Sequence, residues 1–204
     1  QTCHIPFMAV RAATKMSWDW STAGQDLEPD DPRTYSKKKG TFTFARNVPP
    51  EYRWYDGGAS RYLPGDTIDP DRVTELNRPH GDVGGARARI WPFKLHRGKQ
   101  AYDTEHRYFH TPKTFGEGGY WTDFDWDKAL RLGAEATGLP YSGSFGFAET
   151  VMYWPLSHMV APKEKALQCA DCHGANGRMD WQALGYRRDP AFGGGRRRAG
   201  TTTR

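Results

Sequence analysis

The chain has 204 residues, of which 37% are hydrophobic and 14% aromatic, and its formal net charge is +5. No stretch approaches the roughly 18 consecutive apolar residues that span a membrane, and no nucleic-acid-reading element accompanies the basic runs at 37–39 and 196–198. The chain has few aliphatic residues but many aromatic ones, with 8 Trp, 10 Tyr and 10 Phe. This composition leaves two interpretations open: a loop-rich, partly disordered chain, or a chain packed around a non-protein group.

The predicted elements are mostly helical and are separated by turn-rich segments. In chain order they are a short helix within 1–24, a loop-like region over 25–88 with a short strand at 41–44, a strand end at 90–93, and helices at 123–137, 148–160 and 162–172. The helix at 123–137 has the clearest limits, because Asp123 suits an N-cap and Gly138 and Pro140 follow its end. Pro162 suits the first turn of the last helix, and Pro155 kinks the one before it. We therefore expect a mainly α fold with long irregular loops and little β structure.

The composition changes near residue 185. Residues 1–185 contain most of the apolar and aromatic side chains, whereas residues 186–204 are rich in Arg, Gly and Thr and bury too little surface to become ordered. The chain has no initiator Met, and its first four residues resemble the inside of a motif. We therefore expect residues 1–185 to be the C-terminal part of a longer protein, followed by a disordered tail at 186–204.

The segment Cys169-Ala170-Asp171-Cys172-His173 has the spacing of c-type haem attachment. Two thiols add to the two vinyl groups of the porphyrin, and the short turn between the cysteines matches the separation of those groups. The adjacent His173 then lies under the iron as its proximal ligand. The motif predicts haem c bound by Cys169, Cys172 and His173, and a core organised around haem.

Three other interpretations of the two cysteines are weaker. A zinc site needs two more ligands at suitable spacing, and the chain has no second complete Cys-x-x-Cys. A thioredoxin-type redox pair is expected where a strand meets a helix, and it requires no His after the second Cys. A structural disulfide is unusual at this two-residue spacing.

The remaining cysteine, Cys3, precedes His4 as the last cysteine of a haem motif would. If the segment Cys-Gln-Thr-Cys-His has lost its first Cys by truncation, Cys3 and His4 hold a second haem with one thioether bond. We therefore expect two haems, with His4 and His173 as iron ligands.

Each iron needs a sixth ligand or an open position, and His158 is the candidate that we prefer. It lies in an apolar and aromatic segment that begins at Tyr153, and the expected straight helix places it about 16 Å from Cys169. His158 would then bind the iron of a neighbouring haem more easily than that of its own motif. A buried structural role for His158 stays open, and Met159 is a softer candidate that would raise the redox potential. The other histidines are expected at the surface: His80, His96, His106 and His110.

Longer strings of the sequence resemble the C-terminal part of the octahaem c-type cytochromes of the tetrathionate reductase family. They include Thr14-Lys15-Met16-Ser17-Trp18-Asp19-Trp20, Tyr120-Trp121-Thr122-Asp123-Phe124-Asp125-Trp126, Gly138-Leu139-Pro140-Tyr141-Ser142-Gly143, and Met152-Tyr153-Trp154-Pro155-Leu156-Ser157-His158-Met159. The resemblance follows the order of the chain over about residues 1–180 and is more specific than the haem motif alone.

This resemblance implies a periplasmic or otherwise exported protein with closely stacked haems, most of them ligated by two His. It also implies reduction of tetrathionate or related sulfur and nitrogen oxyanions at a haem attached outside this chain, so no catalytic residue is expected here. The chain would be the electron-transfer segment of such a reductase. Its expected partners are the other haems and periplasmic or quinol-linked electron donors. The alternative is a non-catalytic multihaem conduit or redox partner protein.

Overall fold

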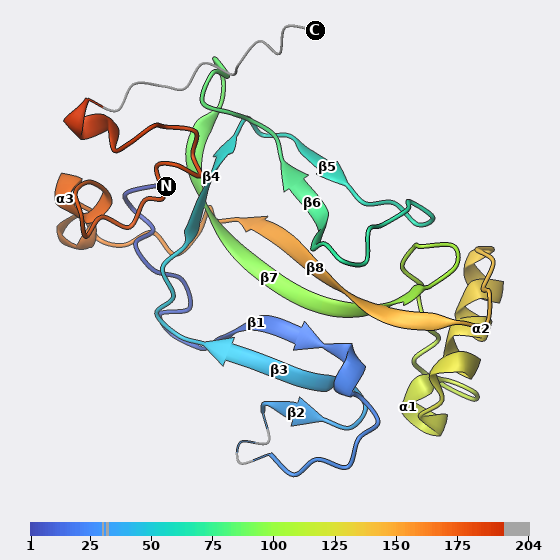
Figure 1. Ribbon diagram of the computed structural model, residues 1–204. Coiled ribbons are helices and arrows are strands. Elements are labelled where there is room, and N and C mark those ends of the chain that lie inside the picture. Colours follow the sequence, from blue (N-terminus) through green and yellow to red (C-terminus); the bar gives the residue numbers. More distant parts are fainter. Residues whose placement is uncertain (30, 32, 194–204) are drawn as a thin grey trace, which may run out of the picture.

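A mixed β-sheet forms the centre of the fold in the computed structural model, which describes residues 1–29, 31 and 33–193 (Figure 1). Its strands are β1 (Thr14–Asp19), β2 (Tyr35–Ser36), β3 (Gly40–Ala45), β4 (Glu51–Tyr55), β5 (Ala59–Arg61), β6 (Thr74–Pro79), β7 (Arg89–Asp103) and β8 (Phe145–Pro155). The helical elements are α1 (Tyr120–Asp123), α2 (Trp126–Thr137) and α3 (Cys169–Cys172), with 3-10 turns η1 (Trp20–Thr22), η2 (Lys163–Lys165) and η3 (Pro190–Phe192). The described residues thus form an eight-stranded sheet, and the expectation of a mainly α fold with little β structure is wrong.

β7 and β8 are the central strands of this sheet, whose order is β2-β3-β1-β7-β8-β6-β5 with β4 also paired to β7. The two strands run antiparallel over eleven residue pairs, from Phe93 opposite Pro155 to Asp103 opposite Phe145. One edge of β7 pairs antiparallel with β4 and, further along, parallel with β1. The far edge of β8 pairs in parallel with β6. The long β7–β8 pair therefore joins the two halves of the sheet.

The segment predicted as a helix over 148–160 belongs to β8 as far as Pro155, and no regular element follows directly after it. The side chains of Thr150, Val151 and Tyr153 are buried, and β-branched and aromatic residues suit a pleated surface. A short apolar run does not by itself distinguish a strand from a buried helix. Pairing with β7 satisfies the backbone hydrogen-bonding groups of this segment, and it therefore forms a strand rather than a helix.

Other segments that were expected to be helices or loops also form strands or short turns. The expected helix within 1–24 is strand β1 followed by η1, and the expected helix at 162–172 is divided into η2 and the single turn α3. The loop-like region 25–88 contains the strands β2 to β6. The strand at 41–44 is confirmed within β3, and the strand end at 90–93 is the beginning of β7.

The helix predicted over 123–137 is confirmed as α2. Asp125, rather than Asp123, caps it by accepting a hydrogen bond from the amide of Lys128 at 3.1 Å. Gly138 ends it with a φ of 72°, a left-handed conformation that glycine adopts readily. α1 and α2 lie at one end of the sheet, whereas α3 and the N-terminus lie together at the opposite end (Figure 1).

The described part of the segment predicted as a tail, residues 186–193, contacts the rest of the chain, and residues 194–204 lie outside the described residues. Tyr186 is buried, with its ring centroid 6.4 Å from that of Trp54 and 5.5 Å from that of Trp181. The indole Nε1 of Trp54 donates a hydrogen bond of 2.8 Å to the backbone oxygen of Leu184. These contacts join the chain after α3 to strand β4.

Gly133 of α2 allows a close approach of the helix to the segment before α1. A Cβ at this position would overlap the backbone carbonyl of Thr111. Ala is a better helix former than Gly by about 1 kcal/mol, but the overlap with backbone atoms outweighs this gain. We expect Gly133→Ala to lower the free energy of unfolding by about 1–3 kcal/mol, measured by urea denaturation. The exposed Glu135→Ala on the same helix is the control, and a stabilised Gly133→Ala would contradict the close packing.

Asp103 is a buried carboxylate at the end of β7. It accepts hydrogen bonds from the amides of Glu105 at 2.9 Å, His106 at 2.8 Å and Ser142 at 2.7 Å. Burial raises its pKa, but these hydrogen bonds to the ionised form outweigh burial and lower the pKa to about 2.

The ionised form of Asp103 therefore stabilises the fold, and its contribution is lost on acidification. Because the pKa in the folded chain lies below the usual value, this contribution of about 2 kcal/mol is present above roughly pH 4 and is lost as pH falls toward 2. We expect Asp103→Asn to destabilise the protein at pH 7 and to flatten this part of the stability profile. The exposed Asp71→Asn should keep the profile of the parent chain. Identical profiles for the parent and Asp103→Asn would show that the carboxylate has no such role.

Candidate functional site

The two cysteines of the complete motif are the first and last residues of the single-turn helix α3. The turn is fixed at its start, where the amide of Gln168 donates to Asp171 Oδ2 at 2.7 Å, and at its end, where the amide of His173 donates to the carbonyl of Cys169 at 2.9 Å. Cys169 is exposed and Cys172 is buried. Burial raises the pKa of the Cys172 thiol, and the nearby Cys3 adds to this rise.

His173, directly after α3, has one ring nitrogen held by a carboxylate. Its Nδ1 lies 2.6 Å from Asp189 Oδ1, and its ring stacks on the indole of Trp181 at 4.7 Å between centroids and 14° between planes. Asp189 is fixed in turn by the amide of Gly174 at 2.7 Å and that of Ala191 at 3.0 Å. Partial desolvation raises the pKa of Asp189, but these amides and His173 lower it below its usual value. With Nδ1 as the donor, Nε2 of His173 is left as a lone-pair ligand.

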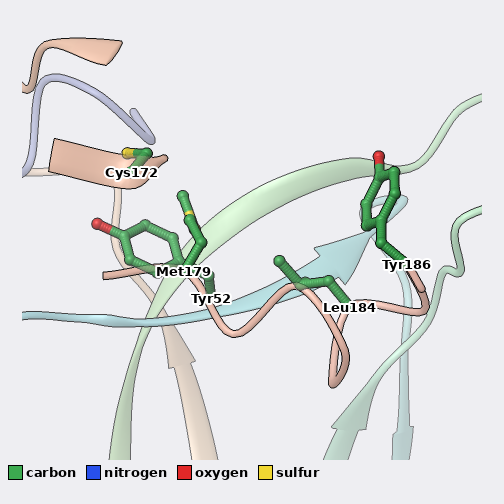
Figure 2. Packing of buried hydrophobic residues seen from close by; sticks show 5 residues of the cluster. All are labelled: Tyr52, Cys172, Met179, Leu184 and Tyr186. Atoms are coloured by element: carbon green, nitrogen blue, oxygen red, sulfur yellow. The ribbon is translucent and has the colours of Figure 1, made fainter. Parts of the chain in front are cut away.

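Buried polar groups lie beside this motif. Cys172 packs in a cluster with Tyr52, Met179, Leu184 and Tyr186, and Figure 2 shows the Tyr52 hydroxyl on the side of the cluster nearest to Cys172. Tyr52 Oη, Arg178 Nε and Trp181 Nε1 are buried without a hydrogen-bond partner among the described residues. Burial raises the pKa of Tyr52, an effect that the adjacent Arg178 partly offsets. Two thiols on one turn, a free imidazole nitrogen and donors that suit propionate oxygens together fit a covalently held haem.

Cys3 and His4 lie against the chain that leads into α3. The carbonyl of Cys3 accepts a hydrogen bond from the amide of Leu167, and that of His4 accepts one from Ala161, both at 2.8 Å. Both side chains are exposed, while Ile5, the next residue, is fully buried. The fold therefore brings the incomplete motif next to the complete one.

His158 is exposed on the segment after β8 and lines a groove with a volume of about 1350 Å³. Because β8 replaces the expected helix, the straight-helix spacing between His158 and Cys169 does not apply. The groove has apolar walls that include the exposed side chains of Phe7, Val10, Trp154, Met159 and Val160. Its described lining also contains His96 and the cations Arg11, Lys94 and Lys165, but no Asp or Glu.

The other histidines occupy different environments. His80 and His106 are exposed, as expected. His96 is half-buried in β7, and burial, with Lys94 and Lys15 nearby, lowers its pKa. His110, also expected at the surface, is instead buried 3.6 Å from Asp103, and burial lowers its pKa. Across the described residues no three His, Cys, Asp or Glu side chains form a group able to hold a metal ion.

Asp189 and Trp181 are functional candidates that the sequence did not reveal. Asp189 lies within the stretch predicted as a tail, and its local signal is an N-cap followed by Pro190, which together begin η3. Trp181 is one of eight Trp residues, and composition does not distinguish it from core aromatics. In the part of the chain that the structure describes, no helix is long and apolar enough to cross a membrane.

Comparisons with known proteins identify the family of the chain. The family described as bacterial cytochrome c matches residues 15–176. The crystal structure of octahaem cytochrome c from Shewanella oneidensis is 51% identical to this chain with a TM-score of 0.91, over 94% of this chain and 46% of that one. This chain therefore spans about half the length of that protein. The search of curated proteins found no match to this chain. The resemblance to octahaem cytochromes is confirmed, and the chain belongs to the bacterial cytochrome c family.

Proposed function

We propose that the chain is an electron-transfer segment of an exported multihaem cytochrome c, with one haem c held by Cys169, Cys172 and His173. Membership of the cytochrome c family implies haem c. The observation that supports this site best is the imidazole of His173, whose Nδ1 is bonded to Asp189 while two thiols lie within the preceding turn. When bound, haem c supplies a one-electron iron couple.

The residues of the chain have separate tasks at this site. The thiols of Cys169 and Cys172 would hold the haem by thioether bonds, and His173 Nε2 would bind its iron. Trp181 covers one face of the imidazole ring and keeps water from it. Tyr52 and Arg178 offer hydrogen-bond donors in a largely apolar surrounding.

A second haem c at Cys3 and His4 is part of the same proposal. The backbone hydrogen bonds from Leu167 to Cys3 and from Ala161 to His4 hold the two motifs together, which favours transfer of electrons between them. The chain contributes no catalytic residue in this proposal. In the longer, periplasmic protein, reduction of tetrathionate or a related sulfur or nitrogen oxyanion would occur at a haem outside this chain. Electrons would arrive from periplasmic or quinol-linked donors.

The groove beside His158 supports a role for this residue as an iron ligand of a neighbouring haem. A haem is a flat apolar disc with two carboxylates, and the groove combines apolar walls with three cations and no acid in its described lining. His158 is exposed at this groove, and Ala161, three residues later, bonds to His4. The groove therefore offers an imidazole, apolar contacts and charges complementary to propionates.

Haem attachment is tested on the exported protein. We expect a pyridine haemochrome spectrum of thioether-linked haem and a tryptic peptide 166–178 that carries the mass of haem. Cys172→Ser should remove one thioether bond from that peptide, and Cys3→Ser should leave the peptide unchanged while altering the other haem. A folded product whose peptide 166–178 carries no haem would contradict the proposal.

Iron ligation by His158 is tested on the full-length protein with all of its haems attached. We expect His158→Ala to convert one haem from low spin to high spin, because an axial nitrogen is lost, as followed by visible and electron paramagnetic resonance spectra. His80→Ala, at an exposed His bonded to Ser60, is the matched control. An unchanged low-spin spectrum in His158→Ala would contradict iron ligation by His158.

A further inference from the structure

The carboxylate of Asp189, which is bonded to His173, is held in place by several hydrogen bonds. Its two oxygens accept from three nitrogens of the chain: His173 Nδ1 at 2.6 Å, the amide of Gly174 at 2.7 Å and the amide of Ala191 at 3.0 Å. The side chain of Asp189 is 14% exposed and that of His173 is 31% exposed, so water reaches the pair only in part. Pro190 in the first turn of η3 further restricts the backbone at Asp189.

We infer that Asp189 is a positioning residue that sets the tautomer and the donor strength of the axial ligand His173. The inference rests on the proposed attachment of haem at Cys169, Cys172 and His173. An ionised carboxylate requires the proton on Nδ1, and this leaves the lone pair of Nε2 for iron. It also draws the Nδ1 proton toward itself, which makes the imidazole a stronger donor, as carboxylates bonded to metal-bound His do. A stronger donor stabilises the ferric form and lowers the midpoint potential.

The second proposed ligand, His4, provides a contrast within the same chain. Its side chain is exposed, and among the described residues the His–carboxylate pairs are those of His173 with Asp189 and His110 with Asp103. The effect of Asp189 is therefore confined to one haem. Trp181 supports the positioning role of Asp189, because its stacked indole restricts the orientation of the His173 ring.

The experiment measures the midpoint potentials of the exported, haem-loaded protein by redox titration followed in the visible spectrum. We expect Asp189→Asn to shift one potential in the positive direction and to leave the others unchanged, with the haem still low spin. Asp189→Ala should give a larger positive shift, and Asp189→Glu should restore a value near that of the parent chain. Asp180→Asn is the matched control, since it removes the same charge from an exposed residue beside Trp181 that bonds to the amide of Ala183.

The outcomes separate the positioning role from the proposed function. If Asp189→Asn and Asp180→Asn give equal shifts, only the charge matters and the inference is overturned. If the parent peptide 166–178 carries no haem, the attachment itself is wrong. Where Asp189→Asn loses its haem, nitrogen-15 nuclear magnetic resonance of the parent protein decides. One axial His with a strongly hydrogen-bonded Nδ1 is expected, and the absence of such a His overturns the inference.

Discussion

The antiparallel pairing of β7 with β8 determines where the two cysteine–histidine motifs lie. Its eleven residue pairs fix the two strands over most of their length, and every other strand except β2, β3 and β5 pairs directly with one of them. The connection between β7 and β8 contains α1 and α2 at one end of the sheet (Figure 1). The chain after β8 leaves at the opposite end, where it meets Cys3 and His4 and then forms α3. One pairing thus separates the helical end of the sheet from the end that carries the two cysteine–histidine motifs.

The sequence predicted those features that depend on neighbouring residues. The motif spans only the five residues from Cys169 to His173. The limits of α2 are set by Asp125 and Gly138, which directly flank the helix, although the sequence favoured Asp123 as its cap. The sheet could not be predicted in the same way, because β8 acquires its partner from a distant part of the chain. An apolar run ending at Pro155 suits either a helix or a buried strand until that partner is known.

The candidate site shows the same division between local and distant information. Cys169, Cys172 and His173 are visible as a motif, whereas Asp189 approaches His173 only after the chain has turned through Trp181 and Leu184. Average composition near residue 186 indicates disorder, but composition does not report a single capping Asp or a stacked indole. Specific contacts of this kind are the ones that orient a metal ligand, and they have a weak sequence signal.

The end that carries the two motifs is also packed against the folded core. Cys172 is both a proposed attachment thiol and a member of the cluster with Tyr52 and Leu184. The carbonyl of Leu184 accepts a hydrogen bond from Trp54 on β4, so the segment that carries Trp181 and Asp189 is fixed to the sheet. Tyr186 continues this connection, because its ring packs against both Trp54 on β4 and Trp181. If His173 binds iron as proposed, its orientation therefore rests on packing against the sheet as well as on the motif itself.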